Sequence, residues 1–91
     1  MKLFLVHAGF YDENVSGGFY ESHTNYFIVA DGVKEAKNKV KEIHEYKKKE
    51  MHIDGIREID SVDGYKVVLE RNGKRAQDSG NKYSYDDVKK M

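Results

Sequence analysis

Two apolar runs in the first third of the chain predict β-strands. The first, residues 2–9, is apolar at nearly every position, which is typical of a strand in the centre of a sheet. The second, residues 24–30, is rich in aromatic and β-branched side chains. Between them, Gly17-Gly18 can supply the positive φ angles of a reversal, so residues 10–21 are predicted to form a loop or a distorted hairpin.

The spacing of the apolar positions changes after residue 30. They now recur every three or four residues, at Val33, Ala36, Val40, Ile43 and Tyr46. This spacing predicts one amphipathic helix over residues 31–49, with Asp31 as its N-cap. The polar face contains two acid-first pairs at i,i+4 spacing, Glu35 with Lys39 and Glu45 with Lys49, which stabilise a helix slightly.

Residues 56–70 predict a β-hairpin. Asp63-Gly64 lies between two apolar residues and suits a two-residue type I′ turn. Such a turn sets the register, with the opposed pairs Val62 and Tyr65, Ser61 and Lys66, Ile59 and Val68, and Arg57 and Glu70. Glu58 and Asp60 would then share a face with apolar residues. We therefore expect a bulge near Asp60, or a position for this strand at the edge of the sheet.

These elements follow one another in the order ββαββ. They predict an α+β fold with a four-stranded, mostly antiparallel sheet and one amphipathic helix packed on one face. The predicted domain covers residues 1–71, and residues 72–91 form a C-terminal tail that is weakly structured or contains a short helix from Tyr85. A single helix covers one side of the sheet. The other side must be polar, covered by the tail, or paired with a second copy of the chain.

The composition excludes several classes of protein. The 91 residues are 38% hydrophobic and 35% charged, with 16 basic and 16 acidic side chains. Because this balance gives no overall positive field, we expect neither nucleic acid nor a membrane as a partner. Cysteine is absent, and the apolar run after Met1 is too short for a signal peptide or a membrane span. We expect a cytoplasmic protein without a cofactor.

Two short motifs connect the chain to a known family. Met51-His52-Ile53-Asp54, followed by Val62-Asp63-Gly64-Tyr65 and preceded by a strand and an amphipathic helix, resembles short bacterial proteins known as domain of unknown function 1543. The opening Met1-Lys2-Leu3-Phe4-Leu5-Val6 is also similar to members of that family. The resemblance covers residues 1–70 and supports the order of elements. It implies no catalytic residue.

Histidines near the ends of the predicted strands are candidate metal ligands. His7, His23, His52 and Asp54 could bind Zn²⁺ or Mn²⁺ if they converged, but no pair has a tight ligand spacing. His52 and Asp54 could also act as an acid–base couple in which the carboxylate orients the imidazole. The structural alternatives are histidines that are simply packed or exposed, and a turn at Asp54-Gly55 that reverses the chain.

An aromatic loop provides the other candidate site. Aromatic residues flank Gly17-Gly18 and could either recognise a partner or fold back over the sheet. With two basic residues of the hairpin, the candidate ligand- or partner-binding residues are Phe10, Tyr11, Phe19, Tyr20, Arg57 and Lys66.

Three functions remain open. The first is a non-enzymatic interaction module that uses the exposed sheet face and the aromatic loop, with an unknown protein or small molecule as partner. The second is a protein that binds an anionic metabolite or nucleotide at a homodimer interface. The third is a metal-dependent enzyme that uses the histidines and Asp54.

Overall fold

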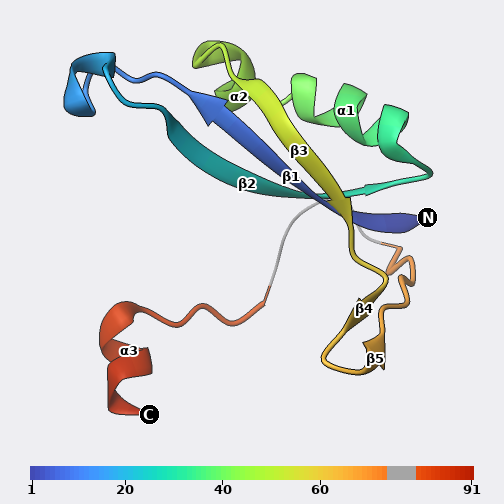
Figure 1. Cartoon of the computed structure of the whole chain (residues 1–91). Coiled ribbons are helices and arrows are strands. Elements are labelled where there is room, and N and C mark those ends of the chain that lie inside the picture. The colour runs from blue at the N-terminus through green and yellow to red at the C-terminus, as the bar shows by residue number, and fades with distance from the viewer. Residues whose placement is uncertain (74–79) are drawn as a thin grey trace.

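A three-stranded antiparallel sheet forms the centre of the molecule. The computed structural model describes residues 1–73 and 80–91, and within them the strand order of this sheet is β2-β1-β3. β1 (Lys2–Phe10) lies between β2 (Ser22–Ala30) and β3 (His52–Glu58) and is antiparallel to both (Figure 1). The apolar first run therefore forms a central strand, as predicted.

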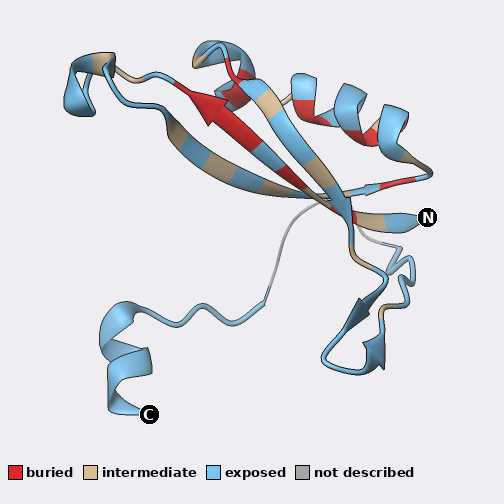
Figure 2. Ribbon diagram, in the orientation of Figure 1, coloured by how far each residue is buried: buried red, intermediate tan, exposed pale blue. Residues whose placement is uncertain are grey.

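One face of this sheet is covered by helices. Successive side chains of a strand point to opposite faces, so alternate residues of β1 share a face. The residues of β1 on the covered face are buried and apolar: Phe4, Val6, Ala8 and Phe10. They pack with Ala36, Val40 and Tyr46 from the helices. Figure 2 shows buried residues in red on β1 and on the helices above it. The expectation of an α+β fold with a helix on one face of the sheet is confirmed.

The predicted single helix consists of two pieces. α1 (Val33–Lys41) begins after Gly32, so the prediction of Asp31 as its N-cap is wrong. α2 (His44–Lys48) follows Ile43, whose extended backbone (φ −69°, ψ 130°) interrupts the helix. Tyr46 of α2 packs in the same core cluster as Phe10 and Met51.

The side-chain contacts along the helices agree with the predicted pairs. Lys39 Nζ lies 3.4 Å from Glu35 Oε1, and Lys49 Nζ lies 3.9 Å from Glu45 Oε2. Apolar spacing alone does not show the break at Ile43, because Ile43 and Tyr46 keep the helical interval and both still pack into the core.

β3 begins at His52 and contains a β-bulge. His7 pairs with Gly55, but the next residue of β1, Ala8, pairs with Ile53, so Asp54 is an extra residue on β3. The bulge allows Ile53 and Ile56, which are three apart, both to pack against the core under the helices. The alternative in which Asp54-Gly55 reverses the chain is wrong, because both residues lie within the strand.

The predicted hairpin is only partly formed, and the prediction of a four-stranded sheet is wrong. β4 (Ser61–Val62) and β5 (Tyr65–Lys66) pair around Asp63-Gly64 in the predicted register, but they form a separate two-stranded sheet. The amide of Val67 still donates to the carbonyl of Asp60, and the strand pairing ends there. Residues 67–70, which follow, belong to no strand, and Val68 among them is exposed.

Two short helical segments lie outside the main sheet. The 3₁₀ turn η1 (Ser16–Gly18) lies in the loop between β1 and β2, where Gly17 and Gly18 both have positive φ. α3 (Tyr85–Lys90) begins with a capping box between Ser84 and Asp87. Residues 74–79 of the predicted tail lie outside the described residues. In the part of the chain that is described, no helix has the length and hydrophobicity needed to cross a membrane.

Candidate metal centre

The face of the sheet opposite the helices is uncovered, and we call it the open face. In β1 it carries the residues that alternate with the core: Leu3, Leu5, His7 and Gly9. The register places His23 of β2 and His52 of β3 directly beside Gly9. Asn25 and Gly55 lie in the same way beside His7. Three histidines distant in sequence therefore lie on one end of this face.

Two carboxylates complete a cluster with these histidines. His23 Nε2 lies 2.8 Å from Glu21 Oε1 and 2.9 Å from Asp54 Oδ2. His52 Nε2 lies 3.1 Å from Glu21 Oε1 and 3.0 Å from Asp54 Oδ1. Each carboxylate therefore contacts both imidazoles. We refer to Glu21, His23, His52 and Asp54, with His7, as the histidine–carboxylate cluster.

His7 lies at the side of this cluster. Its ring stacks on that of His23, with the centroids 4.6 Å apart and the planes at 7°. Its Nδ1 lies 2.7 Å from the side-chain oxygen of Asn25. When Nδ1–H donates to Asn25, Nε2 keeps its lone pair, which is the usual arrangement of a metal-ligating histidine and its supporting partner.

Gly9 forms the floor of the cluster. A Cβ atom at this position would lie 2.3 Å from Glu21 Oε1, 2.6 Å from Asp54 Oδ2 and 2.7 Å from His52 Nε2. The donor atoms therefore surround the space directly above Gly9, and any side chain there would collide with them. The absence of a side chain at this position of the central strand allows Glu21, His52 and Asp54 to converge there.

The charges of the cluster affect the pKa values of Asp54 and of the neighbouring Tyr11. Desolvation acts to raise the pKa of Asp54, but hydrogen bonding with Glu21 and the nearby His52 and His23 outweigh it and lower the pKa below its ordinary value. Tyr11 donates a hydrogen bond of 3.3 Å to Glu21 Oε2. The negative charge of Glu21 is the main cause that raises the pKa of Tyr11.

The separations fit a bound transition-metal ion. Metal–ligand bonds of about 2.0–2.1 Å imply ligand atoms about 3.3 Å apart around a tetrahedral ion. The four imidazole–carboxylate separations given above are close to that value, so small outward movements of the side chains would admit an ion. Two triads, His7, His23 and Asp54, and Glu21, His52 and Asp54, each have ligand atoms within 4.8 Å of one another.

The structure brings together all four residues considered as metal ligands from the sequence. His7, His23, His52 and Asp54 lie in one cluster, and Asp54 contacts His52 as the proposed couple requires. The sequence places Glu21 close to His23, as one of several carboxylates near the histidines, but it does not single out Glu21 as a ligand. The role of Gly9 depends on strand register and could not be predicted.

The other candidate binding residues are dispersed. Phe10 is buried in the core, so it belongs to the structural alternative. Tyr11 contacts the cluster through Glu21, whereas Phe19 and Tyr20 are exposed and pack edge to face 4.9 Å apart. Arg57 lies on the open face beside Leu5, and Lys66 lies in β5 of the separate hairpin.

These features define a small α+β domain with a histidine–carboxylate cluster on the uncovered face of its sheet. The chain belongs to the family described as Domain of Unknown Function (DUF1543), whose family model matches residues 18–69. The matched segment contains Glu21, His23, His52 and Asp54, and His7 precedes it. A search of curated proteins and a search of solved structures each find no match.

Proposed function

We propose that this chain is a metal-binding protein that holds one divalent transition-metal ion, Zn²⁺ or Mn²⁺, on the open face above Gly9. The observation that carries the proposal is that two imidazole Nε2 atoms, those of His23 and His52, each lie 2.8–3.1 Å from oxygens of the same two carboxylates. Imidazole and carboxylate together suit first-row transition ions.

The proposed ligands form a central group, Glu21, His23, His52 and Asp54, with His7 beside it. His23, His52 and Asp54 would bind the ion with Glu21, and His7 would bind it in place of one of these or support its orientation. The side chains of the central group are 30–47% exposed. Because the sheet lies below the cluster and solvent above it, a fifth coordination position, beyond these four ligands, would face solvent. Metal sites that carry chemistry keep such a position open.

Metal titration of untagged, chelator-free protein tests the proposal. We expect Zn²⁺ or Mn²⁺ to bind with a stoichiometry of one in isothermal titration calorimetry. His23→Ala and His52→Ala should each weaken this binding at least tenfold, which corresponds to about 1.4 kcal/mol. His44→Ala is the matched control, because His44 is an exposed histidine at the start of α2.

Two results would contradict the proposal. One is the absence of stoichiometric binding of either ion by folded wild-type protein. The other is an equal loss of affinity in His44→Ala and His52→Ala, which would mean that the ion binds surface histidines without preference. Circular dichroism of each variant establishes that the fold is retained.

A second candidate function is recognition of a macromolecule by the aromatic loop. Phe19 and Tyr20 are 77% and 68% exposed, and they pack against each other beside η1. Large aromatic side chains on a surface loop are frequent anchors of protein interfaces. If this loop binds a partner, Phe19→Ala with Tyr20→Ala should remove that partner in an affinity capture and leave the stability and metal affinity unchanged. A capture pattern identical to wild type would exclude the loop as the anchor.

A further inference from the structure

A hollow adjoins the histidine–carboxylate cluster on the open face. It has a volume of about 290 Å³ and is lined by Leu5, His7, Asn25, Gly55, Ile56 and Arg57. His7 belongs to both the hollow and the cluster. A molecule in the hollow would therefore lie between the proposed metal ion at one end and Arg57 at the other.

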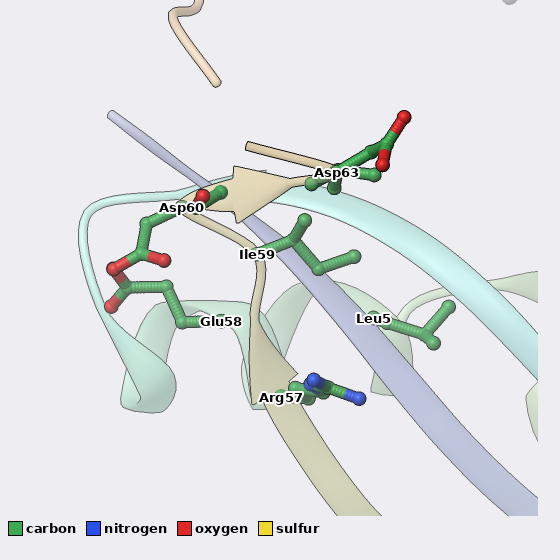
Figure 3. Close-up of a pocket in the computed structure, with 8 residues that line it drawn as sticks. Leu5, Arg57, Glu58, Ile59, Asp60 and Asp63 are labelled. Carbon is green, nitrogen blue, oxygen red and sulfur yellow. The ribbon is translucent and has the colours of Figure 1, made fainter. Parts of the chain in front are cut away.

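The charge of Arg57 has no carboxylate partner within the described ranges 1–73 and 80–91. Arg57 also lines a second hollow of about 400 Å³, which contains the acidic residues Glu58, Asp60 and Asp63. Figure 3 shows the Glu58 and Asp60 side chains on one side of the strand and the Arg57 guanidinium on the other, toward Leu5. Of the two hollows, the one shared with His7 is lined by no acidic residue.

The space between Arg57 and the cluster is open. Gly55 lies between them on β3, and a Cβ atom at this position would have no atom within 4 Å. On β1 the corresponding positions are Gly9, His7 and Leu5, so the path from the cluster to Arg57 spans four residues, or about 13 Å of strand. The long Arg57 side chain shortens the gap that a ligand must bridge.

We propose that this hollow binds a small organic dianion, a short dicarboxylate, whose one end pairs with Arg57 and whose other end coordinates the metal ion. The inference rests on the proposed metal site and names the class of ligand it takes. Arginine suits the first role because its planar guanidinium donates two parallel hydrogen bonds to a carboxylate. The solvent-facing coordination position of the ion suits the second. Leu5 provides an apolar wall for the methylene chain.

A titration with dicarboxylates of increasing length tests the inference. Co²⁺ is used as the metal ion, because its visible spectrum reports a change of ligand. Malonate, succinate, glutarate and adipate are added in turn, with acetate and inorganic phosphate as comparisons. We expect one dicarboxylate to change the spectrum and to bind at least tenfold more tightly than acetate. Phosphate as the tightest ligand would overturn the assignment to a dicarboxylate.

The variant Arg57→Gln isolates the second contact. We expect it to weaken the best dicarboxylate at least tenfold while the Co²⁺ affinity stays within twofold of wild type. Arg71→Gln is the matched control, because Arg71 lines a different hollow with Met1 and Val29. Equal effects of the two variants, or a dicarboxylate affinity no greater than that of acetate, would overturn the inference and leave the metal site intact. A folded protein that binds no metal would instead overturn the proposed function.

Discussion

The two faces of the central sheet use the same three strands in opposite ways. On the covered face, β1 presents Phe4, Val6, Ala8 and Phe10, all buried under α1 and α2. On the open face the same strand presents Leu5 and His7, which are partly or fully exposed, and a glycine beneath polar groups. One face is a continuous apolar layer, and the other divides into an apolar end and a histidine–carboxylate end.

The difference shows how a chain of this size can place the residues that stabilise its fold and the residues of its candidate metal site on opposite faces of one sheet. A residue on the covered face contributes to folding through the apolar surface it buries. A residue on the open face contributes less to folding in this way, because solvent lies on one side of it. Substitutions on the two faces should therefore affect different measurements, and each prediction below tests that separation.

The largest expected effect comes from a pair of phenylalanines on opposite faces. Phe4 on the covered face is 1% exposed, and Phe27 on the open face is 69% exposed. Phe4→Ala should lower the free energy of unfolding by about 3–5 kcal/mol through lost burial and a cavity. Phe27→Ala should change it by about 0.5 kcal/mol or less. Urea denaturation measures both.

Val6→Ala provides a milder test if Phe4→Ala fails to fold. Val6 is also fully buried in β1, and fewer atoms are removed. A loss of stability in Phe27→Ala as large as that in the core variants would contradict the separation, and would show that the apolar end of the open face is buried in an assembly in solution.

Two glycines on the open face give the second comparison. Gly9→Ala places a methyl group among the donor atoms of Glu21, His52 and Asp54, whereas Gly55→Ala meets nothing within 4 Å. The colliding atoms are the ends of flexible side chains, so the fold should be retained. We expect Gly9→Ala to weaken metal binding at least tenfold and Gly55→Ala to leave it within twofold. Calorimetric titration of the folded variants measures both, and equal affinities would show that the ion binds away from Gly9.

The smallest expected effect concerns a phenol under the helices. Tyr26 donates a hydrogen bond to Glu45 of α2, and burial together with that bond raises its pKa from 10.0 to about 12. The unfolded chain therefore loses this proton first as the pH rises. The contribution of Tyr26 to stability should be complete below pH 10 and should be lost as the pH rises from 10 to 12.

Unfolding of wild type and Tyr26→Phe across this range measures the loss. The other tyrosines titrate in both proteins, so the difference between the two free energies of unfolding isolates Tyr26. We expect wild type to lose stability relative to Tyr26→Phe above pH 10. A constant difference from pH 8 to pH 11.5 would contradict the prediction.

The covered face and the turn of the short hairpin were predictable from the sequence because their signals are local. The interval between Ala36 and Val40 shows the face of α1 that is buried, and Asp63-Gly64 shows the turn between β4 and β5. The break at Ile43 and the early end of the hairpin were not predictable in this way. Both depend on tertiary packing that leaves the spacing of apolar residues unchanged.

The candidate site was predictable only as a set of residue types. His7, His23 and His52 are 16 and 29 residues apart along the chain, so no local spacing connects them. They meet because the register places two of them beside Gly9. That register depends on the pairing of three strands, and the contribution of Asp54 depends further on the bulge. Neither can be read from the residues near each histidine.

The bulge at Asp54 also affects how the molecule meets its neighbours. Within residues 1–73 and 80–91, β4 and β5 form their own sheet, so β3 is an edge strand of the main sheet. A regular, flat edge can recruit strands from other molecules and start aggregation. The extra residue and the charge of Asp54 interrupt that edge near its middle. We therefore expect the same irregularity that aligns two isoleucines with the core to disfavour polymerisation through β3.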